Sequence, residues 1–178
     1  MKKLAYLLLL APFVVTSCQT KPAGDTATAK TDTTALPLPY TPKDKSQWET
    51  NPDEHNLQTA LGALKAFEKN DTTAMSKLVG DTVLMQYDGG EIKAKNADFV
   101  TSAKQERDMY KDLTIEMDTW QSVINKDKTQ EWVSLWYTQK WTDEKGKADS
   151  LQVLSDMQMK NGKLVKMVDY SRHFSPNK

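Results

Sequence analysis

Apolar and polar positions alternate most regularly in the last third of the chain. This alternation predicts extended strands at Trp132–Trp141, Ala148–Lys160 and Lys163–Tyr170. Turn-forming residues separate the strands, Asp143–Gly146 in the first gap and Asn161-Gly162 in the second. Both residues of an Asn-Gly pair tolerate positive φ, so the pair favours a tight hairpin. We therefore expect a three-stranded antiparallel meander.

Earlier in the chain the apolar spacing changes to the helical period. Between Leu57 and Phe67 apolar residues recur at intervals of three and four, which predicts a helix capped by Asn51. A second, short helix is expected between Asp71, as its cap, and Gly80. Asn96 is expected to cap a third helix.

Two further strands complete the pattern, one over Thr82–Tyr87 and one that runs from Leu113 towards Ile124. The resulting order is helix, helix, strand, helix and then four strands. This order predicts an α+β domain in which the helices cover one face of an antiparallel sheet.

The first 17 residues have the pattern of a secretory signal: a short basic start, then an apolar run too short to span a bilayer. Val15-Thr16-Ser17-Cys18 resembles the lipobox of bacterial lipoprotein signal peptides. The resemblance implies cleavage before Cys18 and a stable lipid anchor on this residue. An ordinary cleaved signal with an incidental cysteine is the alternative. We expect a lipid-anchored protein of the bacterial cell envelope, and Gln19 is compatible with the outer membrane.

Composition divides the remainder of the chain into a tether and one domain. Residues 18–47 contain the lipidated cysteine and a polar segment too poor in large apolar residues to form a core, which predicts disorder. Residues 48–175 form the predicted domain, which is long enough for a packed core.

Charge and motifs exclude several classes of function. The chain has 24 basic and 24 acidic residues, and loss of Lys2 and Lys3 with the signal leaves 22 basic residues. This balance argues against nucleic acid as a partner. Cys18 is the only cysteine, and no metal-binding, nucleotide-binding or serine-hydrolase motif is present. We therefore expect neither a metal nor a cofactor.

The order of elements resembles the nuclear transport factor 2-like superfamily, with the SnoaL-like and ketosteroid-isomerase-like branches nearest in layout. The resemblance rests on the Asn70-Asp71 break, on Asp81-Thr82-Val83 and on Asn161-Gly162-Lys163-Leu164, and it covers residues 51–173. It implies a curved antiparallel sheet wrapped around about three N-terminal helices, a cone-shaped barrel. It further implies a ligand pocket at the open end and, at the outer sheet face, a homodimer interface.

The same resemblance suggests where catalytic groups would lie. Asp88 falls near the position of the base in the isomerase branch, and Asp156 near the position of the acid. The tyrosine of that branch is absent, because the first helix has Ala63 and Leu64 at that place. A simple turn at Asp88-Gly89-Gly90 is the preferred explanation for Asp88. The missing tyrosine weighs against isomerase activity.

Asp169 is a third candidate, because alternation places it with Val165 and Met167 on one face of the last strand. Among apolar neighbours its pKa would rise and it could act as a general acid or base. The alternative is that it lies near the rim and pairs with a lysine or with Arg172.

Aromatic residues suggest the walls of a pocket for a small apolar or ring-bearing ligand. The proposed lining residues are Tyr87, Trp120, Trp136, Met167 and Asp169. Core packing is the alternative for the tryptophans. Large apolar groups occur on both faces of the Trp132–Trp141 strand. The helices can cover only one of these faces, so the other face favours contact with a partner subunit.

Three functions follow in order of preference. The first is a non-catalytic, lipid-anchored module that binds a small ligand or interacts with other molecules. The second is an isomerase, cyclase or dehydratase that uses Asp88, Asp156 or Asp169. The third is a structural envelope protein that binds a protein partner through its sheet face.

Overall fold

The computed structural model describes residues 38–174 of the chain. The predicted signal peptide, Cys18 and the tether as far as residue 37 lie outside the described residues. Every described helix and strand belongs to one compact unit, Pro42–Lys178. In the described part of the chain, no helix has the length and apolar character needed to cross a membrane.

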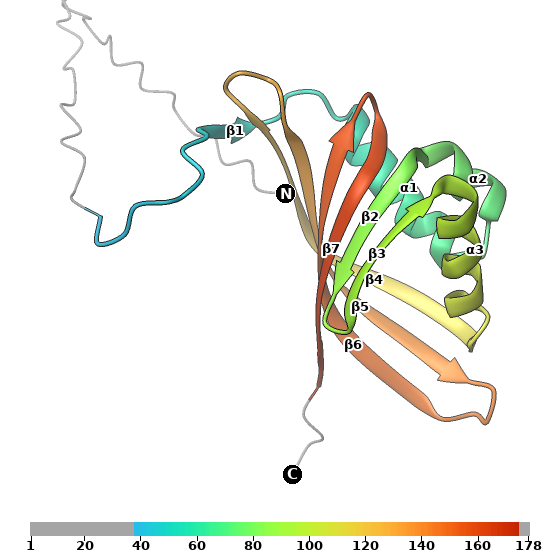
Figure 1. Ribbon diagram of the computed structural model, residues 1–178. Helices are drawn as coiled ribbons and strands as arrows, with labels where there is room; N and C mark the ends of the chain where they lie inside the picture. Colours follow the sequence, from blue (N-terminus) through green and yellow to red (C-terminus); the bar gives the residue numbers. More distant parts are fainter. Residues whose placement is uncertain (1–37, 175–178) are drawn as a thin grey trace, which may run out of the picture. The chain divides into compact units, whose positions relative to one another are not determined.

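The Pro42–Lys178 unit contains three helices on one face of a curved seven-stranded sheet (Figure 1). Its strands run in the spatial order β1-β4-β5-β6-β7-β2-β3. Along the chain the elements are β1 (Trp48–Thr50), α1 (His55–Glu68), α2 (Thr72–Leu78), β2 (Val79–Tyr87), β3 (Gly90–Lys95), α3 (Asn96–Arg107), β4 (Tyr110–Asn125), β5 (Glu131–Asp143), β6 (Ala148–Lys160) and β7 (Lys163–His173). The prediction of an α+β fold with a curved sheet around three helices is confirmed.

The predicted meander is present as β5, β6 and β7, each antiparallel to the next. Asn161 and Gly162 have φ values of 52° and 69°, the left-handed pair expected of a two-residue hairpin turn. The turn lies against the start of α1, where the Thr59 hydroxyl donates a hydrogen bond to the Gly162 carbonyl.

The sheet differs from the predicted one because it is mixed and open. β2 pairs in parallel with β7, with Met85 opposite Met167, so the first long strand joins the last one. Two strands were not predicted: β3, which pairs with β2, and the three-residue β1, which pairs with the end of β4. Both unpredicted strands lie at the edges of the sheet.

Helix starts agree with prediction in one case of three. The Asp71 side chain caps α2 by accepting a hydrogen bond from the amide of Ala74. The Asn51 side chain instead accepts from the amide of Asp53, and α1 begins only at His55. Asn96 is the first residue of α3, and its side-chain amide donates to main-chain carbonyls at the end of α2 and the start of β2.

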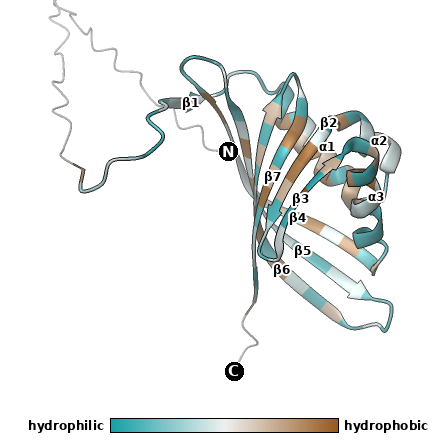
Figure 2. Ribbon diagram, viewed as in Figure 1, coloured by the Kyte–Doolittle hydropathy of each residue, from teal (hydrophilic) through white to brown (hydrophobic). Residues whose placement is uncertain are grey.

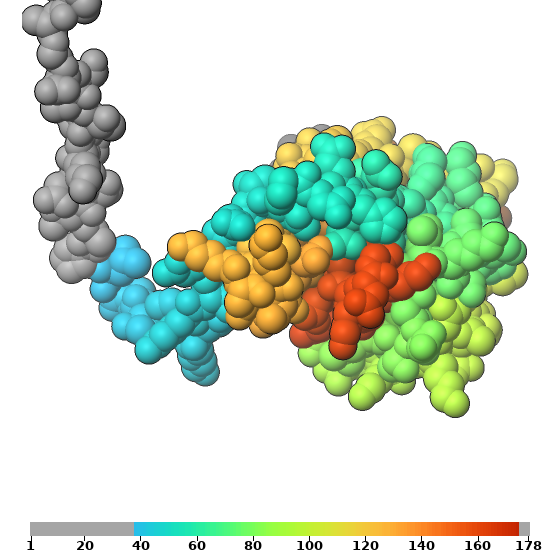
Figure 3. Space-filling model, turned by 90° about the horizontal axis from the view of Figure 1, so that it is seen from above, coloured from blue at the N-terminus to red at the C-terminus, as the bar shows by residue number. Residues whose placement is uncertain are grey.

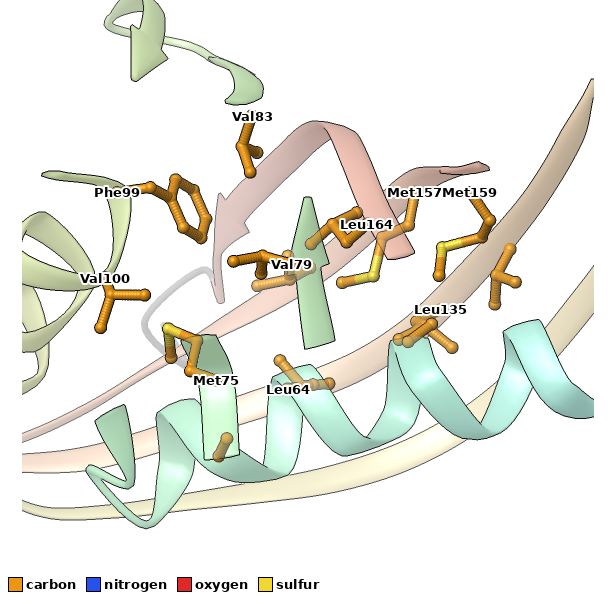
Figure 4. Close-up of a cluster of buried hydrophobic side chains, with 14 of the residues drawn as sticks. Leu64, Met75, Val79, Val83, Phe99, Val100, Leu135, Met157, Met159 and Leu164 are labelled. Carbon is orange, nitrogen blue, oxygen red and sulfur yellow. The ribbon is translucent and has the colours of Figure 1, made fainter. Parts of the chain in front are cut away.

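The core lies between the helices and the concave face of the sheet. Hydrophobic positions gather on β2 and β7 beside the helices (Figure 2). Leu64 and Met75 come from α1 and α2 and meet Val79, Met157 and Leu164 from the strands (Figure 4). The described residues of this core belong to the Pro42–Lys178 unit, so this unit has a hydrophobic core of its own and is expected to fold as a separate domain.

One end of the sheet is held to α1 by polar contacts. Seen from above, the β4–β5 turn in orange and the β6–β7 turn in red lie side by side next to the first helix (Figure 3). The side-chain amides of Asn51 and Asn56 both donate to the carboxylate of Glu131, at the start of β5. The partly buried contact of Asn56 holds α1 to the sheet at the end where the β4–β5 and β6–β7 turns lie, and that of Asn51 holds the segment before the helix.

Candidate functional site

A cavity of about 610 Å³ lies between the helices and the concave face of the sheet. Its volume is within the range of pockets that hold small molecules. Its walls are mainly apolar and come from α1, α2, α3 and strands β2 to β7. The lining residues are Ala63, Leu64, Phe67, Met75, Val79, Met85, Tyr87, Asp88, Ile92, Phe99, Ser102, Ala103, Gln105, Glu106, Met109, Tyr110, Tyr137, Gln139, Leu151, Val153, Met157, Leu164, Met167, Asp169 and Ser171.

The mouth of the cavity can be located from the exposure of its lining. The exposed lining residues gather in the β2–β3 turn, with Tyr87 and Asp88, and at the end of α3, with Glu106 and Met109. The fully buried lining residues, such as Leu164, come from the core. The cavity therefore opens between the β2–β3 turn and the C-terminal end of α3.

Strand alternation places an acid inside this apolar space. Met167, Asp169 and Ser171 follow one another on the concave side of β7, and all three line the cavity. The side chain of Arg172 points to the opposite, convex side of β7 and donates two hydrogen bonds to the side chain of Gln152. Asp169 makes no ion pair with another described residue. The alternative in which it pairs with Arg172 is thereby excluded.

Asp169 is the end of a short hydrogen-bonded chain across three strands. Ser155 on β6 donates from Oγ to Asp169 Oδ1 at 2.5 Å, and Tyr137 Oη on β5 lies 3.2 Å from Ser155 Oγ. A serine hydroxyl has one hydrogen, which here points to Asp169, so Tyr137 is the donor to Ser155. Ser155 is completely buried and Tyr137 is 4% exposed, so the chain is shielded from bulk water.

The surroundings of Asp169 raise its pKa to about 6. Burial is the main cause, because it disfavours the charged carboxylate. The hydrogen bond from Ser155 opposes this shift, whereas the negative charges of Glu106 and Asp156 add to it. At the cavity mouth, partial desolvation also raises the pKa of Glu106, although its side chain reaches solvent. Burial raises the pKa of Tyr137 beyond the accessible range. At neutral pH Asp169 is ionised and Tyr137 is neutral.

The charged side chains that line the cavity in the described part of the chain are all acidic. Its ionisable side chains include three carboxyls, those of Asp88, Glu106 and Asp169, and the described lining residues include no lysine, arginine or histidine. Gln139 adds a neutral polar group that is 7% exposed and lines the cavity. The cavity thus has negative charge and one neutral amide, within otherwise apolar walls.

The structure brings four of the proposed site residues together. Tyr87, Asp88, Met167 and Asp169 line the cavity. Asp156 points to the convex side of β6, where it accepts a hydrogen bond from Ser134. Two of the three candidate acids therefore share one cavity.

The two tryptophans proposed as pocket walls lie elsewhere. Trp136 alternates with the buried Leu135 and Tyr137 and so faces the convex side of β5. Trp120 is 50% exposed and lies on β4, which contributes only Tyr110 to the described lining. Neither is among the described residues that line the cavity, so neither forms its wall.

Four functional groups were not singled out from the sequence: Glu106, Tyr137, Gln139 and Ser155. Tyr137 and Gln139 share the concave face of β5 with Val133 and Leu135, a relationship that alternation would have revealed. Ser155 has no comparable signal, because a serine within a strand is usually only a small polar residue. In the part of the chain that the structure describes, no group of three or more ligating side chains is placed to hold a metal ion.

Comparison with known proteins identifies the fold through solved structures of low sequence identity. No family model matches the sequence, and none of the curated proteins matches it. Among solved structures, AusH from Aspergillus nidulans is similar with a TM-score of 0.56 and 13% identity, over 72% of this chain and 90% of that chain.

Two other solved structures give the same result. An LEH-like epoxide hydrolase from M. tuberculosis has a TM-score of 0.54 and 13% identity, over 66% of this chain and 83% of its own. An NTF2-like protein from Burkholderia pseudomallei has a TM-score of 0.53 and 17% identity, over 65% of this chain and 89% of its own. The chain therefore has the nuclear transport factor 2-like fold.

Proposed function

We propose that the domain binds a small, mainly apolar molecule in its cavity and works from the bacterial cell envelope, where Cys18 anchors it. The observation that supports binding is the cavity of about 610 Å³ with apolar walls and a few polar groups. Side chains that fill a core would leave no such volume, since protein interiors are otherwise close-packed.

Native mass spectrometry of the Pro42–Lys178 unit tests this proposal. A mass excess that disappears on denaturation is expected if a ligand is retained. The variant Ser171→Trp puts a large ring into the cavity from β7 and should abolish the excess. Tyr170→Trp introduces the same ring at the neighbouring position, which faces the convex side, and should leave it unchanged. Equal ligand retention by both variants would contradict binding in the cavity.

Catalysis is the second candidate, and the Asp169 site favours it. Asp169 and Asp88 share the cavity, and a carboxyl with a pKa of about 6 is suited to exchange protons near neutral pH. Ser155 fixes the orientation of the Asp169 carboxyl. Proton abstraction of the kind that isomerases, cyclases and dehydratases perform would use Asp169 as the base.

Deuterium exchange separates catalysis from simple binding. The ligand recovered from the native protein is returned to it in heavy water, and incorporation of deuterium into its carbon framework is followed by mass spectrometry. Exchange that is lost in Asp169→Asn supports catalysis, and exchange no faster than in buffer contradicts it. Asp156→Asn, on the opposite face of the sheet, is the matched control.

The membrane anchor is supported by the sequence alone, through the lipobox-like Val15-Thr16-Ser17-Cys18. Metabolic labelling of the full chain with a radioactive fatty acid in a bacterial host tests it. Label in the wild type and none in Cys18→Ser is the expected result. Membrane fractionation of the same cells tests the proposed outer-membrane location.

A partner on the convex face is a further part of the proposal. Trp132, Trp136, Leu154 and Val168 are partly exposed there, and Tyr170 is 55% exposed. These exposed apolar side chains, which lie among polar residues such as Asp156, suit a second copy of the chain. Light scattering of the Pro42–Lys178 unit should give a dimer mass that Trp136→Lys reduces to that of a monomer. The purely structural alternative, with a protein partner on this face, would need no cavity and is the least favoured.

A further inference from the structure

We propose that the cavity selects a protonated amine attached to an apolar body, in preference to neutral or anionic molecules of the same shape. This inference rests on the proposed binding function and specifies the chemical class of the ligand. The ammonium group would lie against the carboxylate of Asp169, and the apolar body would fill the space between α1, α3 and the sheet.

The charges around the cavity support this choice. Asp169 is largely buried, has no ion pair with another described residue and shares the cavity with Asp88 and Glu106. A buried carboxylate without an opposite charge is unfavourable, and a cation would provide the missing partner. An anionic ligand would meet three carboxyls and no basic group of the described lining, so it would be repelled.

Gln139 offers a further polar contact for a ligand. Its side chain is 7% exposed and lines the cavity. It can accept from an N–H group or donate to an oxygen on the body of the ligand.

The apolar lining determines the remainder of the ligand. Phe99 on α3, Met157 on β6 and Met167 on β7 contribute flat or flexible hydrophobic surfaces to the cavity wall. Methionine side chains adapt their shape and make favourable contacts with aromatic rings. A flat ring system with an aminomethyl group therefore matches both the charge and the walls.

The charged and titratable groups near Asp169 give no alternative counter-ion. Tyr137 faces it from β5, Glu106 from α3 and Asp156 from the other side of β6, and each is acidic or neutral. Asp88 lies in the β2–β3 turn at the mouth. Protonation of Asp169 below its pKa of about 6 should consequently weaken the binding of a cation.

The test uses three naphthalene probes with one framework: 1-naphthylmethylamine, 1-naphthylmethanol and 1-naphthoate. Each is titrated into the Pro42–Lys178 unit by isothermal calorimetry. We expect the amine to bind at least about tenfold more tightly than the alcohol, and the carboxylate to give no measurable heat of binding. In Asp169→Asn the preference for the amine should fall below about threefold, whereas Asp156→Asn should retain it.

A pH series on the wild type gives a second measurement that needs no variant. Amine affinity should fall by about tenfold between about pH 7.5 and about pH 5, and alcohol affinity should change little. Equal or tighter binding of the alcohol or the carboxylate would overturn the preference for a cation but leave the binding function intact. Failure of all three probes, with no ligand in the native mass spectrum, would overturn both.

Discussion

Ser155 lies directly across from Asp169 in the β6–β7 pairing, and its hydroxyl donates to the Asp169 carboxylate at 2.5 Å. The same arrangement occurs on the opposite face of the sheet, where Ser134 is paired with Asp156 and donates to it. The two Ser–Asp pairs have the same chemistry but different surroundings, since only Asp169 lines the cavity. The Ser134–Asp156 pair is therefore a built-in control for experiments on the Ser155–Asp169 pair.

Asp169→Asn should stabilise the domain at neutral pH. The folded-state pKa of about 6 is above the ordinary aspartate value of 3.8, so the folded state binds more protons than the unfolded state between these values. The stability that Asp169 contributes therefore falls as pH rises from about 4 to about 6, by roughly 3 kcal/mol. Asparagine does not titrate, so the variant avoids this loss. Urea unfolding at about pH 7.5 should therefore show an unfolding free energy that is roughly 2–3 kcal/mol higher for the variant than for the wild type.

The gain should disappear at about pH 4, where aspartic acid is mostly protonated in the folded state. Asp156→Asn removes a carboxyl on the convex face and should give no stabilisation at neutral pH. An Asp169→Asn variant that is less stable than the wild type at about pH 7.5 would contradict the unfavourable burial of this carboxylate.

Ser155→Ala should raise the pKa of Asp169 further. The Ser155 hydroxyl favours the ionised carboxylate, and its loss also leaves the Tyr137 hydroxyl without its partner in a buried site. We expect a loss of about 1–3 kcal/mol in unfolding free energy. Titration of the Asp169 carboxyl carbon by NMR should show the shift. Ser134→Ala is the control and should leave the Asp169 titration unchanged.

Truncation of Leu135 and of Met167 should have different consequences. Leu135 is completely buried and does not line the cavity, so Leu135→Ala leaves a new void and should reduce stability by about 2–5 kcal/mol. Met167 is only partly buried beside the existing cavity, so Met167→Ala should reduce stability by less. Urea unfolding of both variants measures the difference, and an equal loss would contradict an open space beside Met167.

Gly162→Ala should destabilise the β6–β7 turn more than Gly146→Ala destabilises the β5–β6 turn. Both glycines have positive φ, 69° and 82°, which costs an alanine about 1 kcal/mol. At Gly162 a Cβ would also lie 2.8 Å from Nε2 of His55, whereas at Gly146 it would meet nothing within 4 Å. Thermal unfolding of both variants measures the two losses of stability. The difference between them is the part that comes from the contact between the β6–β7 turn and α1.

Local patterns predicted most of the fold, and their limits have physical causes. The β5–β7 meander follows from alternation and the Asn161-Gly162 turn, both of which act between neighbouring residues. Strand β3 alternates Ile92 and Ala94 with charged residues, but it is only six residues long and mostly exposed, so the pattern is too weak to predict a strand. The parallel pairing of β2 with β7 joins residues about 80 positions apart, and no local pattern encodes it.

The candidate site was predicted in part for a related reason. Alternation placed Asp169 and Met167 together on one face of β7, and the structure has both in the cavity. On β5 both faces contain large apolar residues, so the pattern did not identify the concave one, and Trp136 was assigned to it in place of Tyr137. Ser155 and Gln139 belong to the site through cross-strand neighbours, which are fixed only when the register is known.

The pairing of β2 with β7 also determines when the cavity can exist. Its walls include Val79 and Met85 near the start of the domain and Asp169 and Ser171 near its end. A chain emerging from the ribosome therefore has no cavity until its last strand is available. Contacts between such distant segments slow folding, so a ligand added during refolding should act only on the final step, in which β7 joins β2.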